Sequence, residues 1–275
     1  MASLVPNAAN ATPSAEASKL KGELTISAAS SLTDAFTALA VQFRKDNKGL
    51  KVRLNFGSSS TLVAQIQAGA PSDVLASADL SSIEKLVASG QVVAAPKVFA
   101  RNTMSIAVKP GNPKAVRAIA DLASLPFIAL CGKTVPCGVY ASSVLTRAGV
   151  VIAESRVTRG IDVKATLSAV ANGDADAAIV YKTDVLAAKK TVVGIDIPST
   201  QNVKSMYGIA PMRGSKNLIN AKVFIDFVLS KQGWQVLNSF GYGRPGVQEG
   251  DRLVQRHPNS YGLEQYSLCC FCCCP

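Results

Sequence analysis

Histidine is almost missing from this chain: its 275 residues contain one, His257, close to the C-terminus. A Ser-His-Asp hydrolase needs an imidazole base beside its nucleophile, and catalytic metal sites usually draw on imidazole ligands. The motif G-x-S-x-G is absent, and neither G-x-x-x-x-G-K-[ST] nor G-x-G-x-x-G follows a predicted strand. A Ser-Lys hydrolase remains formally open, but we expect a protein that is not an enzyme.

Long apolar runs and runs of basic residues are missing as well. No stretch approaches the roughly 20 apolar residues that span a bilayer. The chain carries 29 Lys and Arg against 18 Asp and Glu, a net charge of +11, yet it has no run of five or six basic residues, and its aromatic content is 6%. We therefore expect no nucleic-acid partner. The positive charge either has no function or steers anionic ligands from a distance.

Cysteine is scarce in the body of the chain, because five of the seven cysteines lie in the last seven residues. Their contiguous arrangement lacks the loop-separated pairs of a zinc site. We expect residues 246–275 to form a non-native or disordered tail. Residues 1–21 are small, polar and Pro-containing, a composition typical of a flexible leader.

Strand and helix patterns alternate along the rest of the chain. Residues 23–28 alternate as a strand, and Ser30 and Ser31 then come before apolar residues at helical spacing, which predicts a Ser-capped helix. A second unit repeats this order, with a strand at 51–56 and the triplet Ser58–Ser60 before a helix. Further strands are predicted at 73–77, 127–131, 176–181 and 204–212, and further helices ending at 90, near 116–122, through 144–148, at 162–172, through 223–228 and through 234–237.

This alternation predicts an α/β protein with parallel, doubly wound sheets. The pattern restarts after the extended segment 102–108, so we expect two lobes with a cleft and a hinge. Lobe 1 is predicted at 22–103 and 210–245, and lobe 2 at 104–209.

Serines therefore fall at the carboxyl ends of the strands, where α/β sheets place their ligand sites. A helix start offers unpaired N–H groups, and a serine there adds a hydroxyl donor, which together bind anions without a cationic side chain. Residues 56–79, FGSSSTLVAQIQAGAPSDVLASAD, contain no Lys or Arg. The alternative is that each serine only caps its own helix.

Five segments between about Glu23 and Pro245 resemble the molybdate-binding components of ATP-driven importers, a family of two-lobed extracytoplasmic solute-binding proteins. In chain order they are SAASSLTDAF, the 56–79 stretch, VPCGVYA, IDVKATLSAV and DAAIVYKTD. The resemblance implies a type II periplasmic-binding-protein fold, with two doubly wound α/β lobes joined by a two-segment hinge.

The resemblance also implies which residues hold the oxyanion, all of them neutral donors. Ser31 and Ser59 correspond to serines that bind by hydroxyl and main-chain N–H. Cys137 and Val163 correspond to residues that bind through N–H, and Tyr181 to a tyrosine that donates its hydroxyl. Molybdenum is implied only as the oxyanion bound by these residues, and no cofactor is implied.

Three neighbouring serines, Ser30, Ser58 and Ser60, stay open as one-residue alternatives. A site made only of donors suits a fully ionised dianion such as molybdate or tungstate. It leaves the proton of hydrogen phosphate without an acceptor, provided that neither Asp34 nor Asp79 reaches the ligand. Discrimination against sulfate depends on the size of the pocket.

Cys137 departs from the simplest pattern of that family, in which this position is often alanine. Cys131 lies six residues earlier. In an oxidising extracytoplasmic setting we expect a disulfide between them rather than two free thiols.

Taken together, the sequence predicts a monomeric extracytoplasmic protein that captures molybdate or tungstate by hinge closure and delivers it to an ABC permease in the membrane. The alternative is a binder of sulfate or another tetrahedral oxyanion. The leader resembles the tether that follows a lipidated cysteine, so the protein is periplasmic or lipid-anchored at the cell surface.

Overall fold

The computed structural model of the protein describes residues 20–246, so the leader before residue 20 and the tail after 246 lie outside it. Among the described residues there is no helix with the length and apolar character that a bilayer crossing requires. The strands are β1 (Lys21–Ala29), β2 (Gly49–Gly57), β3 (Val74–Ser77), β4 (Lys97–Val108), β5 (Ile128–Cys131), β6 (Val157–Gly160), β7 (Ala177–Tyr181), β8 (Val193–Asp196) and β9 (Lys204–Pro211). The α-helices are α1 (Thr33–Asp46), α2 (Ser59–Gln67), α3 (Leu80–Ala88), α4 (Pro136–Ala148), α5 (Val163–Asn172), α6 (Lys182–Ala187), α7 (Leu218–Leu229) and α8 (Lys231–Ser239), with short 3-10 turns at Ser30–Leu32, Ile119–Ser124 and Glu154–Arg156.

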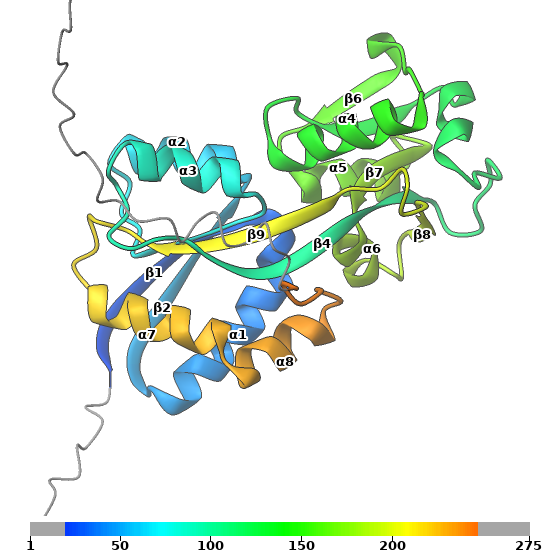
Figure 1. The fold of residues 1–275 in the computed structure, drawn as a ribbon. Coiled ribbons are helices and arrows are strands. Elements are labelled where there is room, and N and C mark those ends of the chain that lie inside the picture. Colours follow the sequence, from blue (N-terminus) through cyan, green and yellow to red (C-terminus); the bar gives the residue numbers. More distant parts are fainter. Residues whose placement is uncertain (1–19, 247–275) are drawn as a thin grey trace, which may run out of the picture. The chain divides into compact units, whose positions relative to one another are not determined.

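The strands follow the order β2-β1-β3-β9-β4-β7-β5-β6, with β8 also paired to β4. We use lobe 1 for residues 22–103 and 210–245 and lobe 2 for residues 104–209. In lobe 1 the strands β2, β1 and β3 are parallel. Figure 1 shows α2 and α3 on one side of these strands and α1, α7 and α8 on the other.

Helical spacing buries one face of α1 against this sheet. Phe36, Leu39 and Phe43 are buried, and Phe36 and Phe43 contact the Phe224 ring of α7 edge to face. Leu24 and Ile26 of β1 are two residues apart, so they point to the same face of the sheet, and they have no exposed surface because they pack in the core formed with these phenylalanines.

In lobe 2 the strands β6, β5 and β7 are parallel. The helix α4 starts where β5 ends, and it packs very closely there. A Cβ atom added at Gly138 would lie 2.0 Å from the carbonyl oxygen of Gly132. Glycine at position 138 therefore allows the first turn of α4 to contact the end of β5.

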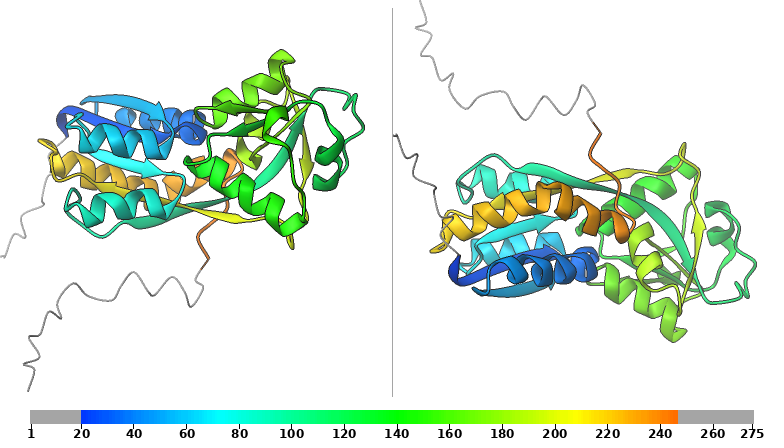
Figure 2. Two further views of the ribbon diagram at one scale, coloured as in Figure 1. Left: turned by 90° about the horizontal axis from the view of Figure 1, so that it is seen from above. Right: turned by 90° about the horizontal axis from the view of Figure 1, so that it is seen from below.

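The two lobes are joined by β4 and β9, which pair antiparallel with each other (Figures 1 and 2). β4 pairs with β9 as far as Thr103 and with β7 from Met104 onward. β9 continues from β4 to β3 in lobe 1. This change of partner lies at the predicted boundary after residue 103, although the lobe bounds themselves stay a prediction.

The predicted α/β class and the two-lobed fold agree with this architecture, and three details differ. The wound strands of each lobe are parallel, but β4 and β9 run antiparallel to their neighbours because each enters a sheet from the other lobe. The predicted helix near 116–122 is wrong, because the Asn112 side chain exchanges two hydrogen bonds with the backbone of Val116, and a 3-10 turn starts only at Ile119. The short elements β6, β8 and α6 were not predicted.

Candidate functional site

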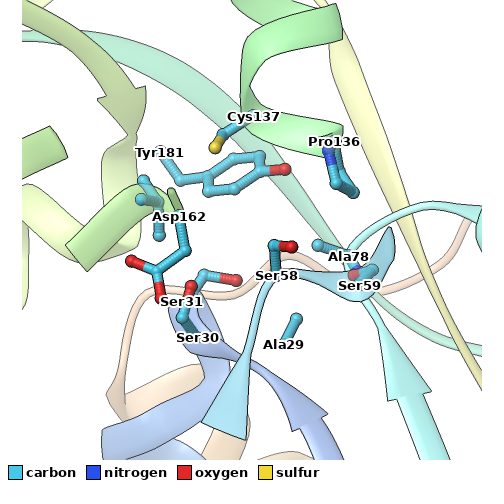
Figure 3. Close-up of a pocket in the computed structure, with 11 residues that line it drawn as sticks. Ala29, Ser30, Ser31, Ser58, Ser59, Ala78, Pro136, Cys137, Asp162 and Tyr181 are labelled. Carbon is cyan, nitrogen blue, oxygen red and sulfur yellow. The ribbon is translucent and has the colours of Figure 1, made fainter. Parts of the chain in front are cut away.

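A small cavity of about 10 Å³ lies at the carboxyl ends of β1, β2, β3 and β7. This is roughly the space that one water-sized sphere needs. Figure 3 shows residues of both lobes around it, with serines from lobe 1 on one side and Cys137 and Tyr181 from lobe 2 on the other. The lining residues are Ala29, Ser30, Ser31, Ser58, Ser59, Ala78, Pro136, Cys137, Asp162, Val163 and Tyr181.

All five predicted ligand residues line this cavity, and all five are buried. Ser31 lies in the 3-10 turn after β1, and its Oγ is 2.9 Å from the hydroxyl of Tyr207. The prediction that these serines cap the next helix is wrong, because α1 has Leu32 as its N-cap residue and no side-chain cap. Ser30 also faces the cavity, so the choice between Ser30 and Ser31 stays a prediction.

The serines of the triplet Ser58–Ser60 make different contacts. Ser58 is the N-cap residue of α2, and its Oγ accepts a hydrogen bond from the N–H of Thr61. Ser59 is the first residue of α2, and its Oγ accepts from the N–H of Ala78 at 3.0 Å. Because that bond uses Ser59 Oγ as an acceptor, its own proton remains for a ligand. Ser60 does not line the cavity, whereas Ser58 does.

Two helices of lobe 2 begin at the cavity. Cys137 is the second residue of α4 and Val163 the first residue of α5. Their N–H groups belong to first turns, which have no intrahelical acceptors, and they lie at the positive ends of the helix dipoles. Cys137 is bonded to Cys131 in a disulfide that ties the start of α4 to the end of β5.

Tyr181 is the last residue of β7, and its hydroxyl is not hydrogen-bonded to any described residue. Its hydroxyl oxygen is buried and has no hydrogen-bond partner among residues 20–246. Burial raises the pKa of this phenol well above its usual value, and the neighbouring Tyr207 raises it further. Tyr181 therefore stays a neutral donor at any physiological pH, facing a cavity where none of the described residues accepts its proton.

One acid on the cavity wall, Asp162, was not predicted as a site residue. It is the N-cap residue of α5, and its Oδ1 accepts from the N–H of Ala165 at 2.9 Å. The pattern Asp-Val-Lys at the start of a predicted helix could have indicated this cap. The two acids named as possible acceptors, Asp34 and Asp79, do not line the cavity, and Asp79 instead accepts from nearby serine hydroxyls.

Lys164, the residue after Val163, connects the lobes beside the cavity. Its Nζ is 2.9 Å from Asp34 Oδ2 in α1 and 3.7 Å from Asp184 Oδ1 in α6. The second distance is an ion pair but too long for a hydrogen bond. The ammonium is thus balanced by one carboxylate from each lobe, so it presents no unbalanced positive charge to the cavity.

Asp184 itself is buried, and neither carboxylate oxygen has a hydrogen-bond partner in the described part of the chain. Burial raises the pKa of this carboxyl to about 7, Lys164 opposes that rise, and Asp34 and Asp162 add to it. Burial also raises the pKa of the Tyr242 hydroxyl, and the nearby Asp184 raises it further.

Two α/β lobes joined by two strands, with a donor-lined cavity that takes residues from both, define a solute-binding protein. The chain belongs to the family of bacterial extracellular solute-binding proteins, whose family model matches residues 24–243. It is 32% identical over 248 residues to the molybdate-binding protein ModA of Mycobacterium tuberculosis H37Rv, covering 89% of this chain and 94% of that protein.

Solved structures give the same class. The periplasmic molybdate-binding protein of Azotobacter vinelandii superposes with a TM-score of 0.74 at 25% identity, covering 81% of this chain and 100% of that one. The sulfate-binding protein SubI of Mycobacterium tuberculosis H37Rv superposes with a TM-score of 0.72 at 17% identity, covering 83% and 88%. The second likeness shows the fold alone. The family and these relatives agree with the prediction that the protein is a transport component and not an enzyme.

The raised pKa of Asp184 predicts a pH-dependent stability. Below pH 3.8 the carboxyl is protonated in both the folded and the unfolded chain, and between there and about 7 only the unfolded chain loses the proton. The free energy of unfolding should therefore fall as the pH rises through this window and level off above it, by a few kcal/mol, an order-of-magnitude figure. Asp184→Asn should be more stable than the original protein at pH 8, with the difference shrinking toward pH 5. Urea unfolding at each pH measures this.

The exposed acid Asp226 offers a matched control, since Asp226→Asn should follow the original protein at every pH. An Asp184→Asn variant that loses stability at pH 8 would contradict the assignment of a buried, destabilising charge.

Proposed function

We propose that this protein binds molybdate outside the cytoplasm and presents it to an ABC permease. The observation that carries the proposal is the Tyr181 hydroxyl, a buried donor without a hydrogen-bond partner among residues 20–246, facing a cavity at the first turns of α2, α4 and α5. Donors from both lobes meet there without a lysine or arginine on the wall. Such a set of donors fits a small, fully ionised oxyanion.

The five lining residues Ser31, Ser59, Cys137, Val163 and Tyr181 are the proposed ligands of the oxyanion. The three hydroxyls and the first-turn N–H groups can all donate, which matches a dianion that only accepts. The molybdate-binding relatives support this identity of the solute. Molybdate is here the transported ligand, so no cofactor takes part.

Because the ligand bonds to both lobes, it stabilises the form in which they are close together. β4 and β9 are the segments that cross between the lobes, so they form the proposed hinge. The anion then acts by shifting the protein toward the closed form, which the permease would recognise. The Lys164 contact to Asp34 would break on opening, because it joins α5 to α1.

Three finer points stay predictions. Tungstate is proposed as a second ligand because it is a tetrahedral dianion of nearly the same size. A monomeric state is also proposed, and the molar mass from analytical sedimentation would test it. A lipid tether is supported only by the Ser, Ala and Pro content of residues 1–21, which lie mostly outside the described structure, and membrane fractionation of the native protein would test it.

Calorimetric titration with molybdate, tungstate, sulfate and phosphate tests the proposal. We expect saturable binding of the first two, weaker binding of sulfate and very weak binding of phosphate at about pH 8, where it carries a proton. Absence of heat with both molybdate and tungstate would contradict the proposed function. Binding of sulfate more tightly than of molybdate would favour the alternative.

Tyr181→Phe should weaken molybdate binding about 10- to 100-fold, because it removes one charge-assisted hydrogen bond. It should not lower the stability of the ligand-free protein, since the hydroxyl has no hydrogen bond to lose within the described part of the chain. Tyr140→Phe is the matched control: its ring contacts that of Tyr181, but its hydroxyl bonds to the backbone of Met206 and does not line the cavity. The control should lose some stability and keep its affinity, and the opposite pattern would argue against the assignment of Tyr181.

The disulfide is expected to hold the N–H of Cys137 in place. Removing it in Cys131→Ser/Cys137→Ser should lower the free energy of unfolding by about 2 kcal/mol on the chain-entropy estimate for so short a loop, and should weaken molybdate binding. Reduction of the original protein with a thiol should reproduce both effects. If neither the melting temperature nor the affinity changes, the disulfide has no role in organising the site.

A further inference from the structure

Asp184 is a buried acid that the proposed set of ligand residues does not use. It lies in α6 and is 1% exposed, and neither of its carboxylate oxygens has a hydrogen-bond partner among the described residues. An ionised carboxylate without such partners is costly in a protein interior, because nothing replaces the water that it loses. The burial and the missing hydrogen bonds therefore favour the protonated form of this group.

The charges around Asp184 leave an excess of negative charge beside the cavity. Lys164 Nζ is 3.7 Å from Asp184 Oδ1, and the same ammonium is 2.9 Å from Asp34 Oδ2. Asp162, the N-cap residue of α5, adds a third carboxylate that also acts on Asp184. Three carboxylates thus share one ammonium, and the carboxylate among them that lacks a hydrogen bond is the buried one.

The other polar groups that face Asp184 stay uncharged near neutral pH. They include three buried phenols, from β7, β9 and the segment after α8, and the pKa of each is raised by burial and by the nearby Asp184. These phenols belong to Tyr181, Tyr207 and Tyr242. From β4, the neutral amide of Asn102 contacts Thr183, the residue before Asp184.

The charged residue that β8 contributes is engaged elsewhere. Asp196 Oδ1 is 2.8 Å from Lys182 Nζ, so these two side chains pair with each other. Asp184 is therefore the group of this region in which a change of protonation near neutral pH is expected. Burial raises its pKa to about 7, Lys164 opposes the rise, and Asp34 and Asp162 add to it.

The proposed ligand would add two negative charges close to this carboxylate. Tyr181 lines the cavity, and the charge of Asp184 acts on its phenol, so the two places lie within electrostatic reach of each other. Among residues 20–246, no lysine or arginine lines the cavity to offset the dianion. Like charges disfavour the ionised form of an acid, and burial reduces the screening by water and salt.

Closure of the lobes acts in the same direction as the ligand. Asp34 belongs to α1 in lobe 1, whereas Lys164 and Asp184 belong to lobe 2. The charge of Asp34 raises the pKa of Asp184, and opening would move Asp34 away. Both steps of capture, closure and binding, therefore favour the protonated form of Asp184.

We propose that Asp184 takes up one proton as the lobes close on the dianion, so that capture of the oxyanion is coupled to protonation of the protein. This inference rests on the proposed function. Asp162 is the competing site for the proton, because it lines the cavity. Its ionised form keeps a hydrogen bond from the N–H of Ala165, whereas ionised Asp184 keeps none within the described chain.

The direction of the pH dependence follows from this coupling. In the ligand-free protein the pKa of Asp184 is about 7, so above that pH the group is ionised and binding must add a proton. Molybdate affinity should therefore fall as the pH rises above 7, and each unit by which the ligand raises the pKa corresponds to about a tenfold change. We expect an affinity roughly tenfold lower at about pH 9 than at about pH 6.5, a range in which molybdate itself is fully ionised.

Calorimetric titration with molybdate at about pH 8, in two buffers of different ionisation enthalpy, measures the protons taken up. We expect roughly half a proton or more for each molybdate bound by the original protein. Asp184→Asn keeps the shape of the side chain without its charge. This variant should take up no proton, and its affinity should stay within about twofold across the same pH range, a small free-energy difference.

Two further variants serve as controls. Asp226→Asn changes an acid whose side chain is 71% exposed, and it should take up as many protons as the original protein. Asp162→Asn removes the charge on the cavity wall and keeps a residue that can cap α5. Proton uptake should persist there, shifted to lower pH because Asp162 helps to raise the pKa of Asp184. Uptake that is lost in Asp162→Asn and kept in Asp184→Asn would overturn the assignment.

The outcomes separate the two proposals. If the original protein does not bind molybdate at any pH, the proposed function fails, and this inference fails with it. If the protein binds molybdate but takes up no proton at about pH 8, and its affinity is the same at both ends of the pH range, only the proton coupling is overturned. That measurement uses the original protein, so it decides the question even if Asp184→Asn does not fold.

Discussion

The antiparallel pairing of β4 with β9 is the interaction on which the two lobes depend. β4 leaves the pairing with β9 at Thr103 and joins β7 in lobe 2, while β9 passes from β4 to β3 in lobe 1. The sheet of each lobe therefore includes a strand that begins in the other lobe. This pairing sets how the carboxyl ends of β1 and β2 face the first turns of α4 and α5, and it carries Asn102 and Tyr207 to the back of the site.

The chemistry of the site depends on where the charged side chains lie relative to the cavity. Among residues 20–246, no lysine or arginine lines the cavity, and the nearby Lys164 contacts Asp34 and Asp184. Binding is left to hydroxyls and to N–H groups at helix starts, whose partial charges are directional. A fixed ammonium would attract every anion, whereas directional donors select by shape and by protonation. The positive surplus of the chain lies elsewhere and can act on anions only at long range.

Hydroxyl groups are ambiguous recognition elements, because each can donate or accept. In this structure Ser59 Oγ accepts from the N–H of Ala78, and Ser31 Oγ is 2.9 Å from the hydroxyl of Tyr207. Tyr181 differs, since its hydroxyl oxygen has no partner in the described chain and its proton has no protein acceptor. The donor character of the cavity is thus a property of the surrounding network as much as of the lining residues.

The sequence by itself determined the α/β class, the run of serines at strand ends and, through its resemblance to a known family, five of the eleven residues that line the cavity. Local patterns carry this information because strand alternation, helix spacing and first-turn serines depend on neighbours in the chain. Only the tertiary structure decided that Ser58 caps α2 while Ser59 bonds to Ala78, that Asp162 stands on the wall, and that Lys164 joins the lobes. Nor could the sequence show that Asn102, Tyr207 and Ser31 are hydrogen-bonded in a row, because those contacts join residues far apart in the chain.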